Sequence, residues 1–236
     1  MAFGFNKFQT ISRLSGSANR NKGTNECNGT GKIVTAQSKF GGASFDGTTG
    51  GSVFVNNFPA VNLGGGSYTI EGWIMIPSAT SGQKELFRSY NGVSASGGSI
   101  TLRPQGGNVY DIEYSFEGEN WNTNGLQSWT YGVWYHFAIV RYSTGPITNI
   151  FLNGTRRSNR TATHTYPLGS QSAGQLRINH GGNAVYLDEI RISTNSRYAN
   201  AATMTVPTAA FTNDANTSLL LHMNGTNGSN LIPDDF

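Results

Sequence analysis

The sequence predicts an all-β fold, a two-sheet antiparallel jelly-roll sandwich with an extended N-terminal arm, on three observations. Glycine occurs 31 times in 236 residues and aromatic residues make up 11 %, so the chain has both the turns and the large side chains that a core of short strands requires. Charged residues make up only 12 %, which disfavours long solvated helices and coiled coils. From residue 38 onward, runs of β-branched and aromatic residues recur between turn residues, as in sandwiches.

The longest predicted strand, residues 68–76, carries large residues on both faces. Because side chains alternate along a strand, they form two sets: Tyr68, Ile70, Ile74 and Ile76 on one face, and Thr69, Glu71, Trp73 and Met75 on the other. This pattern predicts a central strand between the core and a second covered surface, with Trp73 and Trp134 largely buried. Asn153-Gly154 predicts a tight hairpin, since both central residues of a type I′ turn need a positive φ. Further strands are expected at 52–56, 85–90, 99–103, 109–116, 134–141, 147–152, 175–178, 185–192 and 218–223.

The predicted organisation is an arm at 1–37, the sandwich at 38–223 and a tail at 224–236. The arm is rich in glycine and polar residues, and Phe3, Phe5 and Phe8 are its expected docking anchors. Residues 1–40 hold six basic residues and one acidic residue, which would steer the arm onto an acidic protein surface. The basic residues are scattered and no groove-binding motif follows them, so no nucleic acid partner is expected. Deleting residues 1–35 is expected to leave the sandwich folded.

Features of export and of membrane insertion are not apparent in the sequence. The single cysteine, Cys27, cannot form an internal disulfide. The first residues lack the apolar stretch of a signal peptide, and no segment has the length of a membrane span. We therefore expect cytoplasmic synthesis without a signal peptide and no membrane partner.

Five stretches, taken in order, resemble the signature segments of laminin G-like (concanavalin A-like lectin/glucanase) domains. They are KFGGASFDG (39–47), YTIEGW (68–73), WYHFA (134–138), IFLNG (150–154) and LDEIRIS (187–193). Residues 196–199, 206–214 and 219–225 resemble an extension found in laminin G-like proteins of tailed phages, especially phages of marine bacteria. In those proteins a strand like 219–225 often precedes the domain. Pairing of residues 218–223 within the chain or with a neighbouring copy is therefore left open.

The resemblance implies a non-enzymatic virion protein of a tailed bacteriophage, made in the host cytoplasm. The leading hypothesis is a capsid decoration or cement protein that docks through its arm onto other virion proteins or further copies of itself. The alternative is a carbohydrate-binding receptor-recognition module of a tail fibre or appendage, with a host surface glycan as partner. A third hypothesis is a glycan hydrolase.

The hydrolase hypothesis depends on one acidic strand. Alternation places Asp111, Glu113, Ser115 and Glu117 on one face, and Ile112, Tyr114 and Phe116 on the other. Glycosidases use two carboxylates as acid and nucleophile or base. The run does not reproduce the tight Glu/Asp motif of the glycosidases of this fold, so we assign no catalytic residue and expect an acidic face in water.

Two further groups of residues are candidates for binding. Aromatic faces and amides suited to a sugar come together in one segment: Asn120, Trp121, Asn122, Trp129 and Tyr131. The alternative is that these rings fill the core or a subunit contact. The candidate calcium ligands are Asp46, Asp188 and Asp214, but no clustered acidic loop is present, and turn formation explains Asp46 and Asp214 more simply. No metal or cofactor is predicted, and His136 is expected to be a hydrogen-bonded structural residue.

Overall fold

The structure is a computed structural model that describes residues 24–55, 66–79, 82–90, 98–116, 119–122, 127–145, 147–161 and 175–233. The predicted anchors Phe3, Phe5 and Phe8, and Glu117 of the acidic strand, lie outside these residues. Among the described residues no helix has the length and hydropathy of a membrane span.

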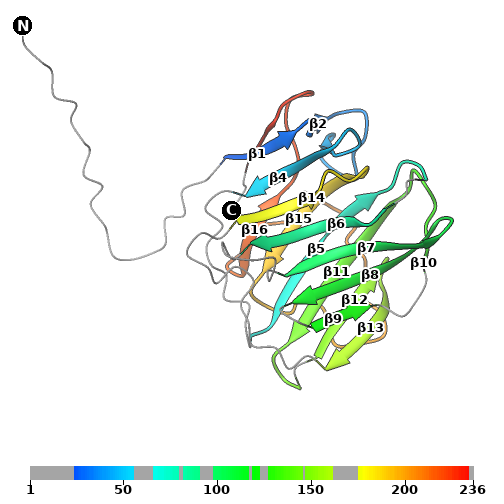
Figure 1. Cartoon of the computed structure of the whole chain (residues 1–236). Helices are drawn as coiled ribbons and strands as arrows, with labels where there is room; N and C mark the ends of the chain where they lie inside the picture. Colours follow the sequence, from blue (N-terminus) through cyan, green and yellow to red (C-terminus); the bar gives the residue numbers. More distant parts are fainter. Residues whose placement is uncertain are drawn as a thin grey trace, which may run out of the picture.

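Two antiparallel sheets pack face to face (Figure 1). Sheet A has the order β10-β8-β7-β6-β14-β4-β1-β17, with β9 also paired to β8. Its strands are β1 (Thr24–Gly29), β4 (Gly51–Val55), β6 (Lys84–Tyr90), β7 (Ser99–Gly106), β8 (Val109–Phe116), β9 (Glu119–Asn122), β10 (Gln127–Ser128), β14 (Gln175–His180) and β17 (Leu231–Pro233). The predicted all-β sandwich is confirmed.

Sheet B has the order β13-β12-β11-β5-β15-β3-β2, with β16 also paired to β15. Its strands are β2 (Lys32–Val34), β3 (Ser44–Asp46), β5 (Tyr68–Met75), β11 (Trp134–Tyr142), β12 (Ile147–Leu152), β13 (Thr155–Thr161), β15 (Tyr186–Ser193) and β16 (Thr217–Leu221). Because β16 pairs with β15 of the same chain, residues 217–221 complete their own sheet.

The main core lies between the two sheets and follows the alternation of the strands. In β5, Tyr68, Ile70 and Ile74 point into this core. Trp73 points the other way, into a second apolar cluster on the outer face of sheet B. The predicted central strand with two covered faces is therefore confirmed.

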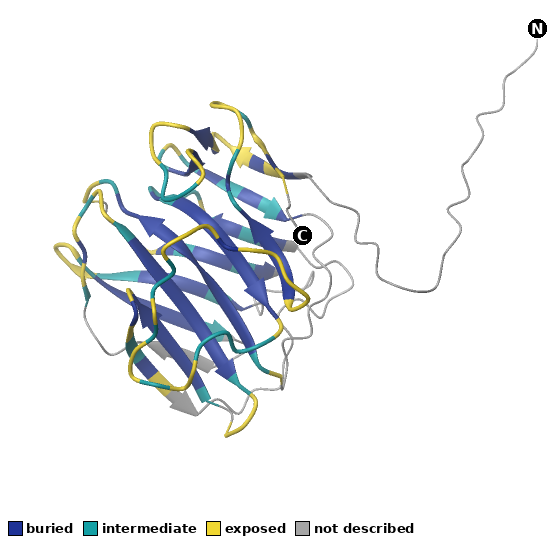
Figure 2. Ribbon diagram, turned by 180° about the vertical axis from the view of Figure 1, so that it is seen from behind, coloured by how far each residue is buried: buried dark blue, intermediate teal, exposed yellow. Residues whose placement is uncertain are grey.

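The outer face of sheet B is covered by residues 194–216, which we call the strap. The strap is tied to the β12–β13 hairpin: the Arg156 amide donates to the Ala202 carbonyl at 2.9 Å, and the Met204 amide donates to the Gly154 carbonyl at 2.8 Å. Figure 2 views the molecule from this side and shows irregular chain crossing the buried strands. Phe211 and Val206 of the strap pack with Trp73, which is 3 % exposed, and with the half-buried Trp134.

The sandwich begins before residue 38 and ends after residue 223, which corrects the predicted boundaries. Strand β1 pairs with β4, and β2 pairs with β3. Ile33 of β2 and Ile232 of β17 are both fully buried in the main core. Sequence periodicity missed these strands because each contributes only one or two apolar residues among polar ones.

Candidate functional site on the outer face of sheet A

The outer face of sheet A is largely polar because apolar and polar residues alternate along most of its strands. In β8, Tyr110, Ile112 and Tyr114 belong to the main core. Asp111 and Glu113 lie between them and therefore point to the outer face, as the sequence predicted. Both carboxylates are largely buried there, at 6 % and 9 % exposure, so the expectation that this acidic face lies in water is wrong.

Strand register arranges the outer side chains in two rows that run across the strands. Residues directly opposite each other in an antiparallel pair share a face and have Cβ atoms roughly 4.5–5.5 Å apart. The first row is Glu26, Phe54, Arg177, Arg88, Ser99 and Ser115, one residue from each of six neighbouring strands. The second row is His180, Glu85, Thr101 and Glu113.

Glu85 joins the two rows through its carboxylate. Nη1 of Arg88 donates to both carboxylate oxygens, at 2.9 and 3.1 Å. Nδ1 of His180 lies 2.5 Å from Oε2 of Glu85, and the Asn183 amide group donates to the backbone carbonyls of Glu85 and His180. This network joins the side chains of β6 and β14.

Arg103 connects the two acidic residues of β8. Its Nη2 lies 2.6 Å from Oε2 of Glu113, and its backbone pairs with Asp111. Burial raises the pKa of Asp111, and the charge of Arg103 opposes this rise. The face thus presents carboxylates, guanidinium groups and hydroxyls within a few strands of each other.

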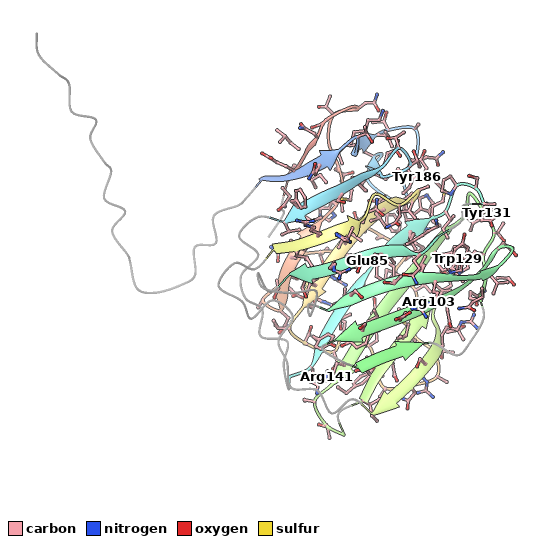
Figure 3. The ribbon with its side chains drawn as sticks, in the orientation of Figure 1. Glu85, Arg103, Trp129, Tyr131, Arg141 and Tyr186 are labelled. Carbon is pink, nitrogen blue, oxygen red and sulfur yellow. The ribbon has the colours of Figure 1, made fainter. Side chains whose placement is uncertain are left out.

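The predicted sugar-binding residues are divided between different environments. Trp129 is 1 % exposed, and its ring centroid lies 4.4 Å from that of Tyr135 in the core. Its aromatic faces are therefore enclosed, which agrees with the alternative that this ring fills the core. Tyr131 packs against the same core and donates its hydroxyl to the Gly107 carbonyl at 3.3 Å; Figure 3 shows it beside Trp129.

The remaining sugar candidates lie on β9, next to the two rows. In the backbone register Asn120 lies opposite Ser115, Trp121 opposite Tyr114, and Asn122 opposite Glu113. Their side chains are outside what the structure describes. The register therefore places the backbone of this predicted segment beside the outer face of β8.

The three calcium candidates have separate hydrogen-bond partners. Asp46 accepts hydrogen bonds from the amide and hydroxyl of Thr48, which forms a turn. Asp188 accepts from the amides of Lys39 and Phe40. Asp214 binds Arg197 through both oxygens at 2.8 Å, and this contact lowers its pKa. Within the described ranges, no three His, Cys, Asp or Glu side chains are grouped to bind a metal.

Sequence reasoning missed most of the two rows. Arg88, Arg177 and His180 come from segments about 90 residues apart in the chain, and only the β6–β14 pairing brings them together. A bulge between Glu85 and Phe87 further shifts the alternation of β6. Sequence alternation could find Asp111 and Glu113 because they share one strand.

Comparisons with known proteins agree with this architecture. A family model described as the concanavalin A-like lectin/glucanases superfamily matches residues 46–203. No curated protein sequence matches the chain. A similar solved structure is domain 4 of AbnA, a GH43 extracellular arabinanase from Geobacillus stearothermophilus, in complex with arabinotriose. It is 14 % identical with a TM-score of 0.55, covering 76 % of this chain and 86 % of that chain.

Two other solved structures have comparable similarity. A protein from Bacteroides ovatus ATCC 8483 with a proposed carbohydrate-binding role is 15 % identical with a TM-score of 0.52, covering 95 % of this chain and 63 % of that chain. A receptor binding domain is 14 % identical with a TM-score of 0.52, covering 75 % of this chain and 44 % of that chain. At this identity the three likenesses show a shared fold.

Proposed function

This chain belongs to the concanavalin A-like lectin/glucanases superfamily, and we propose that it binds carbohydrate through the outer face of sheet A. One observation carries the proposal. Two rows of mostly hydrogen-bonding side chains cross this face, whereas the strap covers the outer face of sheet B. Strands lie about 4.8 Å apart, so each row offers polar groups at a spacing similar to the length of one sugar ring.

The comparisons support a carbohydrate ligand at the level of the fold. The arabinanase domain was solved with arabinotriose, and the Bacteroides ovatus protein has a proposed carbohydrate-binding role. Because one fold hosts many functions, it is the two polar rows of this chain that support carbohydrate binding here. The support favours the carbohydrate-binding alternative over the capsid-decoration hypothesis.

A glycan array followed by calorimetric titration of the hits tests the proposal. Arg103→Gln and Glu113→Gln should each weaken binding about ten-fold, because each removes a charged hydrogen-bonding partner from the face. Arg157→Gln is the matched control, since Arg157 is a half-buried arginine on β13 of sheet B. An array with no bound glycan, or equal affinity in all three variants, would contradict the proposal.

We further propose that the domain binds without chemical turnover. The carboxylate of Glu113 is already held by Arg103, which leaves it poorly placed to attack a sugar. One observation nevertheless favours a glycan hydrolase as second candidate: Asp111 has a raised pKa beside an ion-paired Glu113, and glycosidases pair an acid with an ionised carboxylate. Release of reducing ends from a bound polysaccharide, lost in both Asp111→Asn and Glu113→Gln, would establish the hydrolase.

The location in a phage particle is a further proposal, which derives from the resemblance of residues 196–225. A receptor-recognition module would lie on a tail fibre or appendage, and a decoration protein on the head. Electron microscopy of particles labelled with an antibody to this chain distinguishes the two. Absence of the chain from purified particles would contradict both.

A further inference from the structure

A row of side chains crosses one end of sheet B on its outer face. In β5, Met75 points the same way as Trp73, away from the main core to which Ile74 belongs. Strand register continues this position across the sheet, because residues directly opposite each other share a face. The rim row, as we call it, has one residue on each of five strands: Trp134 on β11, Met75 on β5, Tyr186 on β15, Asp46 on β3 and Lys32 on β2.

Two aromatic rings of the rim row remain partly accessible. Trp134 and Tyr186 are half-buried, whereas Met75 between them is only 2 % exposed. Trp134 packs against the apolar cluster around Trp73, so its ring is supported from one side. Two strand spacings separate Trp134 from Tyr186, so their backbones lie about 10 Å apart. The row thus presents two ring surfaces with a closed apolar floor between them.

Hydrogen-bonding groups that no described residue occupies accompany the rings. The indole N–H of Trp134 donates to no described acceptor. Oδ1 of Asp46 accepts from the amide and the hydroxyl of Thr48 at 2.8 and 2.6 Å, whereas its Oδ2 accepts from none of the described residues. The exposed ammonium of Lys32 forms no ion pair within the described ranges. Two donors and one acceptor are therefore available along the rim row.

The charges of the rim row cancel. Lys32 and Asp46 lie opposite each other and carry one charge of each sign. The next row inward places Trp73 opposite Asp188, a buried acid, and the ammonium of Lys39 lies 4.0 Å from the ring centroid of Trp73. Rings with nearby donors and an acceptor, but without a charge excess, favour a neutral ligand that carries hydroxyl groups.

We infer that the rim row is a second glycan-binding site, which takes a neutral oligosaccharide across the strands of sheet B. Sugar rings have an apolar face and hydroxyls at their edge, so the first and third sugars can lie against Trp134 and Tyr186, with the middle one over Met75. Oδ2 of Asp46 and the ammonium of Lys32 would bind hydroxyls at one end. This site lies on the sheet opposite the two polar rows and does not depend on them.

Titration calorimetry of the full chain with neutral oligosaccharides of increasing length tests the inference. The probes are the dimers, trimers and tetramers of the cellulose, xylan and laminarin series. We expect at least one series to bind, with the trimer about ten-fold tighter than the dimer, because only the trimer reaches both rings. Series that bind equally tightly as dimer and trimer, or no binding in any series, would overturn the inference.

Ring variants locate the bound trimer. Trp134→Ala and Tyr186→Ala should each weaken its binding about ten-fold, and Tyr186→Phe, which removes only a hydroxyl, about three-fold. Tyr142→Phe is the matched control, since Tyr142 is a half-buried tyrosine farther along β11 on the same face, and it should change affinity less than two-fold. Equal loss in Tyr142→Phe and Tyr186→Phe, or a proline decamer that binds as tightly as the best trimer, would contradict a glycan site here.

Hydroxyl-radical footprinting of the unaltered chain keeps the test independent of variant folding, because Trp134 also packs against the cluster around Trp73. Bound trimer should reduce the oxidation of Trp134 and Tyr186 at least two-fold and leave that of Tyr142 unchanged. Binding without protection of Trp134 and Tyr186 would show that the sugar binds elsewhere and would overturn the inference.

The variants also distinguish the rim row from the proposed face of sheet A. If Arg103→Gln and Glu113→Gln abolish trimer binding and the ring variants do not, the rim site is wrong and the face of sheet A stands. If only the ring variants lose binding of every glycan, the rim site stands and the proposed face of sheet A is wrong. Partial loss in both sets supports two sites.

Discussion

Glu71, in the middle of β5, is a fully buried carboxylate that links three parts of the molecule. Nε and Nη2 of Arg191 on β15 donate to its Oε1 at 2.9 and 2.6 Å. The Tyr198 hydroxyl of the strap donates to Oε2 at 2.5 Å, and Nε2 of His136 lies 3.3 Å away. Burial would raise the pKa of Glu71, but His136 and the charge of Arg191 outweigh burial and lower it. His136 is fully buried beside this carboxylate, but neither of its ring nitrogens has hydrogen-bond geometry to a described atom, so its predicted hydrogen-bonded role stays a prediction.

Glu71→Gln should destabilise the fold by about 3–5 kcal/mol, because it leaves the largely buried Arg191 without its counter-charge. Denaturant unfolding measures this free energy. Glu26→Gln is the control, since Glu26 is exposed on β1 and its loss should change stability by less than about 0.5 kcal/mol. Similar losses of unfolding free energy in the two variants would show that the contacts of Glu71 do not hold the strap against sheet B.

Asp188, on β15, differs from Glu71 because no charged partner compensates its burial. Its side chain is fully buried and accepts hydrogen bonds from backbone amides, among them those of Lys39 and Phe40 at 2.7 and 3.1 Å. Burial raises the pKa of Asp188 from its ordinary 3.8 to about 7, although these hydrogen bonds oppose the rise. The folded protein therefore holds a proton that the unfolded chain releases above pH 4.

The contribution of Asp188 to stability should fall as pH rises from about 4 through about 7, because the folded state binds more protons than the unfolded state in this range. Asp188→Asn keeps an acceptor for both amides and does not titrate. Its unfolding free energy should match that of the parent near pH 3, where Asp188 is protonated in both states, and exceed it increasingly up to about pH 8. Denaturation midpoints measured for both proteins at each pH isolate Asp188 from histidine titrations. Parallel pH profiles would contradict the expectation.

At the scale of the elements, the β12–β13 hairpin is one of the contacts of the strap. Gly154 has a φ of 77°, and a Cβ at this position would lie 2.6 Å from the Met204 carbonyl oxygen and 3.0 Å from Val206. The turn and the strap therefore both require glycine. The sequence predicted the hairpin from Asn153-Gly154, but not the strap that lies against it.

Gly154→Ala should destabilise the protein by about 2 kcal/mol more than Gly107→Ala. Both residues have a positive φ, which costs an alanine roughly 1–2 kcal/mol. A Cβ at Gly107 meets no atom within 4 Å, whereas at Gly154 it must displace the strap. Denaturant unfolding gives the difference, and faster proteolysis within residues 194–216 should accompany it. Equal losses of unfolding free energy in the two variants would mean that the strap does not restrict the space at residue 154.

The sequence predicted those strands in which apolar residues recur regularly. Strands with four or more apolar residues, such as β5 and β11, were expected at nearly their observed bounds. The strap has no periodicity because hydrogen bonds and a few apolar contacts hold it to the sheet, rather than a regular strand pairing. The second apolar face of β5 predicted that Trp73 is covered, but not which residues cover it.

At the scale of the whole molecule, strands β1 and β2 make residues 24–34 part of the sandwich. Deleting residues 1–35 should abolish cooperative unfolding, because it removes the buried Cys27 and Ile33 and uncovers Phe45 and Val53. This corrects the expectation that the deletion is tolerated. Deleting residues 1–23 leaves both strands and is the appropriate test of arm docking. Circular dichroism melts of both truncations check the boundary, and a stable protein lacking residues 1–35 would contradict it.

The candidate site shows the limit of sequence reasoning at this scale. Asp111 and Glu113 were found because one strand carries both. The opposition of Arg88 and Arg177 depends on which strands are neighbours and on their register, and neither follows from local alternation. Trp129 shows the converse. The aromatic and amide side chains of its segment suited a sugar site, but the ring of Trp129 packs in the core.

The pairing of the first and last described strands has a mechanical consequence. Thr24 of β1 lies opposite Pro233 of β17, at the same end of the antiparallel pair. A force that pulls these two points apart acts across the strands, so their hydrogen bonds would break one after another instead of sharing the load. Strand β17 would peel off first and withdraw Ile232 from the core. Stretched between its ends, the domain would therefore open like a zipper at low force, starting from this edge of sheet A.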